Sequence, residues 1–404
     1  MLSGKSTVNT TTASVIIDFG NSSTKVTLDY KGECVNFELS NRFSKMPVDY
    51  LPDKSMFSDT DSTLLRYING DDQTRYLNGE AQRVEGRQPM RPMGIEHKQD
   101  TSLTMLSYKL TLLKVYREIA RIDGVYVGAV TDEKVLVPSD VYAYMEGLRV
   151  PLCISTMLPA GDIVKGVSVL SGRIRDVDSV EFVYPNLTLT VSVLKVNIFP
   201  EGYCAYIDRV LCISGDKVVS RPDSTVYRDS KVLLIDIGGG TTNILAIIKG
   251  KPNSQTMQTL NVGGNTVMSG VNREIGQLGF YLNDNDLNDA MRNGYLLDGL
   301  KHFDIKDIIR KYVNSVANEI FEGIRGSLEY ARLPISSMNY LMFTGGGAVA
   351  GNTAVPTLAE GVLDSLHSQC PDIGIVSYAE GTDLRLLNRS GAYLLSKAKS
   401  IPNN

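Results

Sequence analysis

The alternation of apolar and polar residues predicts two β-hairpins that lie far apart in the chain. Val15-Ile16-Ile17 and Val232-Leu233-Leu234-Ile235 are apolar runs, and each is followed by a polar turn and a second strand-like stretch. Short apolar runs that end in Asp and Gly are typical of buried strands that enter a tight turn. We therefore expect strand, turn and strand near the beginning of the chain and again beyond its middle.

A second periodicity, with apolar residues three or four positions apart, predicts helices. This spacing predicts a helix over residues 103–120, with an N-cap candidate at Thr101 or Ser102. The same spacing predicts a longer helix over residues 305–332, which ends before Pro334. The polar face of that stretch carries both signs of charge, which favours a helix packed on a domain core over a membrane-surface or partner-binding helix. Residues 384–399 predict a final helix.

The remaining pattern divides the chain into segments. Residues 135–158 and 180–198 are expected to be rich in strands, and a helical run is expected from Gly263-Gly264-Asn265 to Ile275. Residues 41–100 are polar and contain several prolines, which predicts an inserted small subdomain with loops. We place a domain boundary in the polar link at 220–230, which contains Pro222. A chain of 404 residues exceeds a single ordinary core, so two domains or more are expected.

The two predicted hairpins also share a sequence motif. Ile17-Asp18-Phe19-Gly20-Asn21-Ser22-Ser23-Thr24-Lys25 and Ile235-Asp236-Ile237-Gly238-Gly239-Gly240-Thr241-Thr242-Asn243 match in Ile, Asp, Gly and Thr at identical offsets. Gly and Ser in a turn leave backbone N–H groups free to surround an anion, and an Asp oxygen suits a hydrated Mg²⁺. One copy would fit an ordinary hairpin with an acidic, glycine-rich turn equally well. Two copies in register favour phosphate binding by both.

A third glycine-rich element follows another predicted strand. Tyr340-Leu341-Met342-Phe343-Thr344 runs directly into Gly345, Gly346 and Gly347. Glycines after a strand let the backbone approach a flat or charged ligand closely. The element is weak evidence by itself, and it gains weight from its distance beyond the second hairpin, which leaves room for a helical subdomain.

Composition and charge exclude several classes of protein. The chain is 43% hydrophobic and 21% charged, which is ordinary for a folded protein. The net charge of −4 gives no overall attraction to nucleic acid or to an anionic membrane. The five cysteines form no C-x-x-C pair, and the three histidines are isolated in the sequence. A zinc knuckle, a disulfide framework and a Ser-His-Asp triad are therefore not expected.

The ends of the chain carry no targeting signal that we recognise. Residues 1–14 are rich in Ser and Thr, lack an apolar core and are expected to form a flexible tail. No stretch approaches the roughly 20 apolar residues of a membrane helix. The polar end at 400–404 contains Pro402, which argues against an amphipathic membrane anchor. We expect a cytoplasmic protein that does not bind membranes.

With these motifs the sequence resembles the actin, Hsp70 and sugar-kinase superfamily, and within it the bacterial actin-like plasmid-segregation (ParM-like) proteins. The resemblance covers most of the chain. The two hairpins resemble the phosphate motifs, and Thr344 to Ala348 resembles the adenosine motif. Residues 199–205 and 388–395 resemble the two connecting helices, and residues 76–81 resemble a "G-E-A" turn in the first-half insertion.

The resemblance implies an α/β, actin-like ATPase fold, in which two related domains surround a nucleotide cleft and each carries a smaller inserted subdomain. Domain I is expected at 15–222 with its insertion at about 41–100. Domain II is expected at 223–383 with a helical subdomain at about 265–335. Residues 384–404 are expected to form a helix that returns to domain I.

The resemblance also assigns roles to residues of this chain. Glu201 and Asp236 would be catalytic, and Asp18 and Asp236 would hold Mg²⁺ largely through water. The remaining nucleotide-binding candidates are Gly20, Asn21, Ser22, Ser23, Lys25, Gly238, Gly239, Gly240, Thr241, Thr242, Arg273, Glu274, Gly345, Gly346 and Gly347. A Glu at a helix start is also favoured simply by the helix dipole, and Lys25 could instead face solvent.

Two departures from the family pattern affect the expected ligand. Asn265 stands where many relatives have Asp, and Asn21 stands where Gly or Ser is usual. ATP with Mg²⁺ is the expected ligand, and GTP is the alternative.

Three classes of function share this architecture. A filament-forming ATPase fits the length and the position of Lys25, and a plasmid-segregation role is implied by the resemblance alone. A small-molecule (sugar or acid) kinase is the second class and an alternative, and a cell-shape type of bacterial actin is an alternative among the filament formers. The third class, a chaperone, would continue into a substrate-binding domain. The expected partners are further copies of the chain in a head-to-tail polymer and a DNA-bound adaptor protein, without direct contact to nucleic acid.

Overall fold

The computed structural model describes residues 11–20, 23–50, 62–69, 72–79, 82, 97–125, 139–282, 284–298, 301–349, 355–379 and 381–400. The chain forms two compact units. The first unit comprises Met1–Leu158 and Lys165–Phe199, and the second comprises Pro159–Val164 and Pro200–Asn404. Most of the expected tail at 1–14, together with Asn21, Ser22, Glu80 and Ala81, lies outside the described residues.

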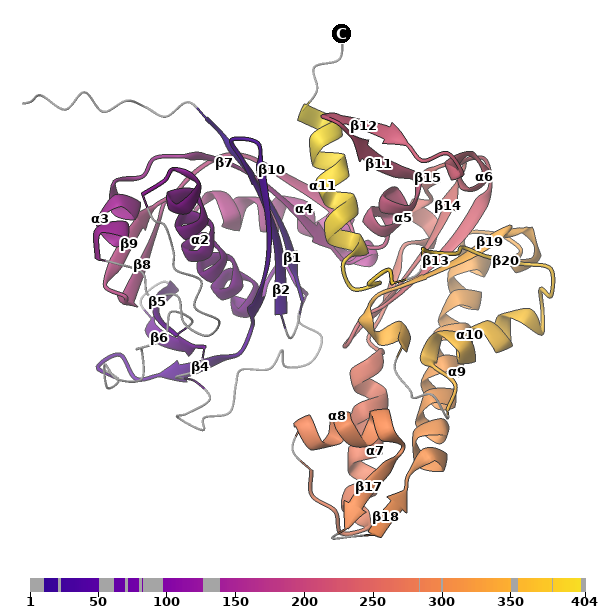
Figure 1. Cartoon of the computed structure of the whole chain (residues 1–404). Coiled ribbons are helices and arrows are strands. Elements are labelled where there is room, and N and C mark those ends of the chain that lie inside the picture. Colours follow the sequence, from indigo (N-terminus) through magenta and orange to yellow (C-terminus); the bar gives the residue numbers. More distant parts are fainter. Residues whose placement is uncertain are drawn as a thin grey trace, which may run out of the picture. The chain divides into compact units, whose positions relative to one another are not determined.

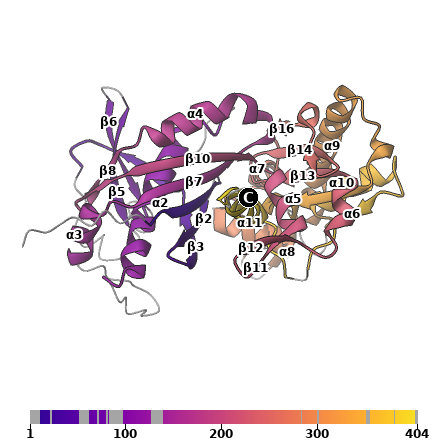
Figure 2. The same ribbon diagram turned by 90° about the horizontal axis from the view of Figure 1, so that it is seen from above.

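The main sheet of the first unit has the strand order β10-β7-β1-β2-β3. Its elements are β1 (Ala13–Phe19), β2 (Ser23–Tyr30), β3 (Glu33–Ser40), β7 (Pro151–Leu158) and β10 (Ser192–Pro200), with helix α2 (Ser102–Ile122) packed on the sheet. β1 pairs antiparallel with β2 and parallel with β7. β7 and β10 lie side by side at one edge of the sheet (Figure 2).

A second sheet of the first unit has the order β4-β6-β5-β8-β9. The elements are β4 (Phe43–Met46), β5 (Thr63–Asn69), β6 (Asp72–Asn78), β8 (Ser179–Tyr184) and β9 (Leu187–Thr190). Helix α3 (Ser139–Gly147) packs on β9, and helix α4 (Ile163–Arg175) follows β7 in the chain. Met46, Leu64 and Leu77 are buried together. The described part of the predicted insertion therefore has its own small apolar core, even though its sequence is polar overall.

The second unit contains a mixed sheet in the order β15-β14-β13-β19-β20, with β16 also paired to β14, and two separate hairpins. The strands are β11 (Leu211–Ser214), β12 (Lys217–Ser220), β13 (Lys231–Ile237), β14 (Thr242–Ile248), β15 (Lys251–Pro252), β16 (Gln258–Leu260), β17 (Tyr295–Asp298), β18 (Lys301–Asp304), β19 (Tyr340–Thr344) and β20 (Gly374–Ile375). The helices are α5 (Tyr203–Val210), α6 (Ser224–Arg228), α7 (Gly264–Gln277), α8 (Asp284–Asn293), α9 (Lys306–Tyr330), α10 (Leu358–His367) and α11 (Leu387–Ser400), and the short 3-10 turns are η2 (Ala160–Asp162), η3 (Ser254–Thr256), η4 (Ile335–Ser337) and η5 (Gly346–Val349).

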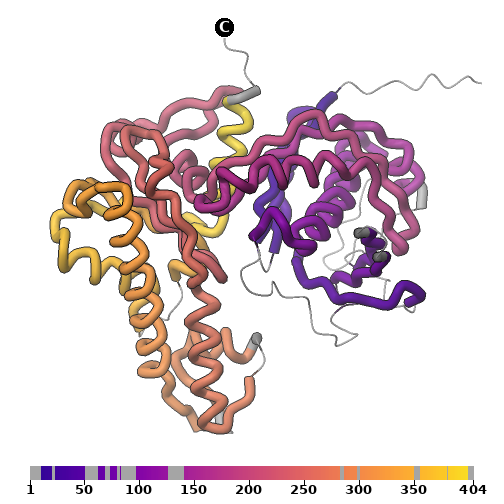
Figure 3. Tube along the Cα trace, turned by 180° about the vertical axis from the view of Figure 1, so that it is seen from behind, coloured from indigo at the N-terminus to yellow at the C-terminus, as the bar shows by residue number. Residues whose placement is uncertain are grey.

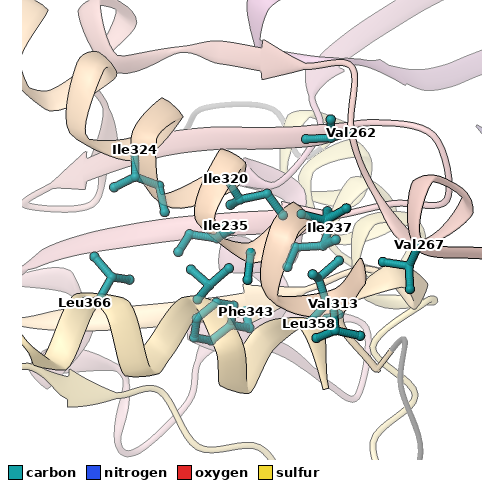
Figure 4. Packing of buried hydrophobic residues seen from close by; sticks show 14 of the residues in the cluster. Ile235, Ile237, Val262, Val267, Val313, Ile320, Ile324, Phe343, Leu358 and Leu366 are labelled. Atoms are coloured by element: carbon teal, nitrogen blue, oxygen red, sulfur yellow. The ribbon is translucent and has the colours of Figure 1, made fainter. Parts of the chain in front are cut away.

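Both faces of this mixed sheet are buried. Leu233 and Ile235 of β13 belong to the apolar core shared with α7, α9 and α10, whereas Val232 and Leu234 belong to the core shared with α5 and α11. Figure 4 shows Ile235 and Phe343 of the sheet packed with Val313 and Ile320 of α9. A strand covered on both faces has a continuous apolar sequence rather than an alternating one. This arrangement explains why residues 232–235 of β13 form a continuous apolar run.

Several helices of the second unit pack along each other. α7 and α9 pack side by side (Figure 3), and α5 and α11 pack side by side (Figure 1). The two longest predicted helices are confirmed: α2 begins after the N-cap Thr101, whose side chain accepts from the Thr104 N–H, and α9 occupies most of 305–332. Within the described residues, no helix is long and apolar enough to span a membrane.

One expectation about the organisation of the chain differs from the structure. Residues 139–147 form helix α3, although 135–158 was predicted to be strand-rich, because Val141 and Met145 stand four positions apart and are buried together on one helical face. The domain bounds at 222 and 384 stay predictions, since α11 packs on α5, which lies within the predicted domain I. The compact units divide the chain at Phe199 and keep α5 and α11 together in the second unit. The physical reason is that α5 and α11 pack against each other and against the β13 side of the sheet.

Candidate functional site

The first predicted phosphate hairpin is formed by β1 and β2. Asp18 pairs with Lys25, and Phe19 pairs with Thr24. The turn is closed by a hydrogen bond of 3.0 Å from the Gly20 N–H to the Ser23 carbonyl oxygen. The Asn41 amide holds the turn from outside, since it donates to the Gly20 carbonyl oxygen and accepts from the Thr24 hydroxyl at 2.8 Å. The residues that flank the turn, Gly20, Ser23 and Thr24, are therefore held by contacts that do not involve a ligand.

Charge on the first hairpin is paired across the two strands. The Lys25 ammonium nitrogen lies 4.0 Å from a carboxylate oxygen of Asp18, and the two side chains are only 15% and 12% exposed. Side chains directly opposite each other on antiparallel strands share one face of the sheet. Lys25 thus lies against Asp18 at the end of the hairpin instead of extending into solvent.

The second hairpin, formed by β13 and β14, repeats this geometry. Asp236 pairs with Asn243, and Ile237 pairs with Thr242. The Gly238 N–H donates to the Thr241 carbonyl oxygen at 2.8 Å, which is the counterpart of the bond from Gly20 to Ser23. The equal offsets in the sequence therefore correspond to equal registers and equal turn bonds in the structure.

Glycine-rich backbone encloses the turn of the second hairpin. The first amides of α7 are bound to it: the N–H groups of Gly264 and Asn265 donate to the carbonyl oxygens of Gly238 and Gly239 at 3.1 and 2.7 Å. These N–H groups have no partner inside their own helix, so the turn supplies it. The Thr242 hydroxyl is also used within the protein, because it is buried and donates to the Val262 carbonyl oxygen at 2.8 Å.

The third glycine element packs against the same turn. β19 pairs parallel with β13, which places Thr344 beside Asp236. A Cβ atom built on Gly347 would lie 2.1 Å from the Gly238 carbonyl oxygen, far closer than any side chain permits. Only glycine allows this approach of two backbones. The structure thus brings together the second hairpin, the start of α7 and Gly345–Gly347, which are far apart in the sequence.

Asp236 is buried and is held by a side chain from the last helix. The Asn388 amide nitrogen donates to a carboxylate oxygen of Asp236 at 2.8 Å, while the Asn388 amide oxygen accepts from the Gly202 N–H at 2.8 Å. Burial, and to a smaller extent the charge of Asp236, raise the pKa of Tyr378, whose phenol donates to the Phe343 carbonyl oxygen at 2.9 Å. Tyr378 therefore stays protonated beside the acidic group.

Glu201, the other candidate catalytic acid, is joined to the second hairpin by Asn243. The Asn243 amide nitrogen donates to a carboxylate oxygen of Glu201 at 3.0 Å, and the Thr259 hydroxyl donates to the Asn243 amide oxygen at 2.8 Å. The Gly161 N–H donates in turn to the Thr259 oxygen at 3.2 Å. Asn243 stands directly opposite Asp236 on the paired strand and binds Glu201 through its side chain. The two buried acids, Asp236 and Glu201, therefore lie near each other.

The candidates Arg273 and Glu274 lie elsewhere on the second unit. They follow Gly264, the first residue of α7, by about 14 Å of helix, at roughly 1.5 Å per residue. Glu274 accepts from the Lys311 ammonium at 2.7 Å, and this hydrogen bond lowers the pKa of the Glu274 carboxyl group. The structure does not bring these two residues to the turn of the hairpin.

Four residues of this region were not found by reading the sequence: Asn243 in a binding role, Thr259, Asn388 and Arg385. The stem of Arg385 covers Gly346, since a Cβ there would lie 3.1 Å from the Arg385 Cγ, and its guanidinium is paired with Asp383 at 2.7 Å. Asn243 occupies the position of Lys25 in the duplicated motif, and this was the one available sequence signal. Asn388 begins the segment 388–395 that resembles the second connecting helix, but the resemblance gave it no role; nothing in the local sequence marks Thr259 or Arg385.

A sheet with a phosphate-type hairpin in each unit, and a glycine element packed on the second hairpin, defines an actin-like fold of the α/β class. The comparisons with known proteins agree. Residues 234–354 match the family model of the archaeal actin homologue MreB-like C-terminal domain. No curated protein matches the chain by sequence.

Solved structures show the same fold over nearly the whole chain. The archaeal actin homologue Ta0583 is 17% identical, with a TM-score of 0.64 over 96% of this chain and 100% of that one. The actin-like protein Alp7A is 16% identical, with a TM-score of 0.62 over 96% of both chains. A ParM from Clostridium botulinum, solved as a 15-stranded filament, is 16% identical, with a TM-score of 0.54 over 96% of this chain and 99% of that one. The predicted resemblance to actin-like and ParM-like proteins is therefore confirmed in the fold.

Proposed function

We propose that the protein is a nucleotide-dependent ATPase that assembles into actin-like filaments. The observation that carries the proposal is the pair of hairpins with equal motif, register and turn bond, of which the second is joined to two buried acids. The relative Ta0583 has been solved in complex with ADP, which supports a nucleotide as the ligand here. ATP is the expected nucleotide, and GTP is the alternative.

The residues of the two hairpins would divide the work of binding and hydrolysis. Gly20, Ser23 and Lys25 would bind phosphate oxygens, and Lys25 would neutralise part of their charge. Asp236 would orient the groups around the terminal phosphate, and Glu201 would take a proton from the attacking water or orient it. Gly345–Gly347 would bind the nucleoside side of the nucleotide through their backbone. Asn21 and Ser22 keep their proposed phosphate-binding role from the motif alone.

The acids of the hairpins suit a hydrated magnesium ion. Magnesium binds through one or two carboxylates together with substrate phosphates and keeps several waters. Within the described residues, no cluster of three or more His, Cys, Asp or Glu side chains could enclose a metal, whereas Asp18 and Asp236 each present a carboxylate at the end of a strand. When bound, the ion would neutralise phosphate charge, and Asp18 and Asp236 would hold it largely through water.

The filament and its biological use are proposed from the relatives. The Clostridium botulinum ParM was solved as a filament, and a head-to-tail polymer of this chain would be a heterologous, non-closing assembly. We propose a cytomotive filament in plasmid DNA segregation, located in the cytoplasm, with a DNA-bound adaptor protein as its partner. The described residues of 41–100 are a candidate surface for the contact between copies.

Sedimentation and electron microscopy with ATP, ADP and a non-hydrolysable analogue test the proposal, together with phosphate release. We expect polymers with ATP and with the analogue, and loss of polymer after hydrolysis. The variant Glu201→Gln should polymerise with ATP and disassemble slowly. A wild-type protein that stays monomeric with all three nucleotides, and that phosphorylates an added sugar or acid, would instead be a small-molecule kinase.

A further inference from the structure

Asn388 occupies a distinctive place beside the candidate acids. It is half-buried on α11, and its amide uses both ends: the nitrogen donates to Asp236, and the oxygen accepts from the Gly202 N–H. An amide flipped by 180° would set its oxygen against the Asp236 carboxylate and its nitrogen against an N–H donor. Both contacts would then be repulsive, so one orientation is fixed.

The backbone around Asn388 is held equally tightly. Gly202 has φ = 76°, and a Cβ on it would lie 2.5 Å from the Leu234 side chain and 3.7 Å from the Asp236 Cβ. A Cβ on Gly391 would lie 1.7 Å from the Cys204 carbonyl oxygen, so α11 and α5 touch backbone to backbone. Three segments remote in sequence, at Gly202, Asp236 and Asn388, therefore meet without room for adjustment.

We infer that Asn388 is a positioning residue that sets Asp236 and the Glu201 segment relative to each other. Gly202 directly follows Glu201, so a single side chain fixes the peptide next to one acid and the carboxylate of the other. The inference rests on the proposed ATPase function, because it concerns the acids that act there. Displacing a catalytic group by about 1 Å can reduce turnover by up to roughly a hundredfold, and loss of an outer hydrogen-bond partner typically costs about 10- to 100-fold.

Two variants separate the two contacts of Asn388. Asn388→Asp keeps an oxygen for the Gly202 N–H but loses the donor to Asp236, whereas Asn388→Ala loses both contacts. Asn339→Ala is the matched control, because the Asn339 amide oxygen accepts from the Lys231 N–H at 2.9 Å at the opposite end of β13. Turnover, nucleotide affinity and amide hydrogen exchange of the peptide that contains Gly202 would be measured for each variant.

We expect turnover to fall about tenfold or more in both Asn388 variants and to stay within about twofold of wild type in Asn339→Ala. Nucleotide affinity of Asn388→Ala should change by less than about threefold, since the contact acts on turnover rather than on binding. Hydrogen exchange at Gly202 should accelerate in Asn388→Ala but not in Asn388→Asp.

Wild-type turnover in both Asn388 variants, an equal loss in Asn339→Ala, or unchanged exchange at Gly202 in Asn388→Ala would overturn the inference. If wild type hydrolyses no nucleotide, the proposed function fails. The exchange experiment then still decides whether Asn388 holds Gly202.

Discussion

The two hairpins have the same register and the same turn bond but opposite surroundings. On the first hairpin Asp18 faces a cation, Lys25, at 4.0 Å. On the second, Asp236 faces Asn243, a neutral amide that holds a second acid, Glu201, at 3.0 Å. The first turn is braced by the side chain of Asn41, whereas the second is enclosed by backbone from α7 and from Gly345–Gly347.

Under the proposed ATPase function, this difference predicts a division of labour between two copies of one motif. On the first hairpin the ammonium of Lys25 offsets part of the negative charge of Asp18, and it remains a donor for a phosphate oxygen. On the second hairpin an amide contacts each of two carboxylates, which under the proposed function would supply a proton acceptor for the attacking water. We therefore expect changes on the first hairpin to reduce affinity and changes on the second to reduce turnover.

The largest effect is expected when Asp18 and Asp236, the equivalent acids of the two hairpins, are each replaced by asparagine. Asp236→Asn should slow phosphate release by about a hundredfold or more, because an oriented charge near the reacting phosphate is lost. Asp18→Asn should reduce turnover at saturating nucleotide much less and should weaken nucleotide binding more. Phosphate release and nucleotide titration of both variants check this. Full activity of Asp236→Asn would remove the second hairpin from the chemistry.

Replacement of the second acid should affect turnover almost alone. Glu201→Gln keeps a partner for Asn243 but cannot accept a proton, so we expect turnover to fall roughly 10- to 100-fold. The dissociation constant of the nucleotide should stay within about threefold of wild type, since the contribution is made in the transition state. A large loss of affinity with normal turnover would move Glu201 to a binding role.

Packing around the second turn can be tested through stability. Gly347→Ala would force a methyl group onto the Gly238 carbonyl oxygen, and the free energy of unfolding should drop by about 1–3 kcal/mol or more. Gly326→Ala is the control, because Gly326 lies in α9 and a methyl group added there would meet open space. Alanine at that position should stabilise the helix by up to about 1 kcal/mol. Denaturant unfolding measures both, and equal effects would mean that the turn is not tightly enclosed.

The smallest expected effect concerns the cation of the first hairpin. Lys25→Met should weaken nucleotide binding by about tenfold, the order of one charge-assisted hydrogen bond, with little change in turnover at saturation. Lys31→Met is the control, because Lys31 follows the same strand and pairs with Asp123 at 2.5 Å. An equal loss in both variants would indicate a general charge effect, and no loss in Lys25→Met would mean that Lys25 only balances Asp18.

Sequence patterns predicted the elements whose periodicity and turn residues lie within one contiguous segment. The hairpins at Asp18 and Asp236 and the helices α2 and α9 were predicted because their periodicities and turn residues belong to contiguous segments. Helix α3 was not, since its Val and Tyr residues favour strands and only the burial of Val141 and Met145 favours the helix. The site divides similarly: Asp18, Glu201 and Asp236 stand in motifs that assign them a role, whereas Thr259 stands in no motif. Asn388 stands in a motif that assigns it none.

The sequence by itself therefore determined the duplicated turn, because its bonds, from Gly20 to Ser23 and from Gly238 to Thr241, lie within four residues. The tertiary structure alone decided what surrounds each turn. Asn388 reaches Asp236 across 152 residues, and Gly347 meets Gly238 because β19 pairs with β13. The physical reason is that a hydrogen-bonded turn is fixed by local backbone geometry, whereas the partner of a buried carboxylate is fixed by which helices and strands pack together.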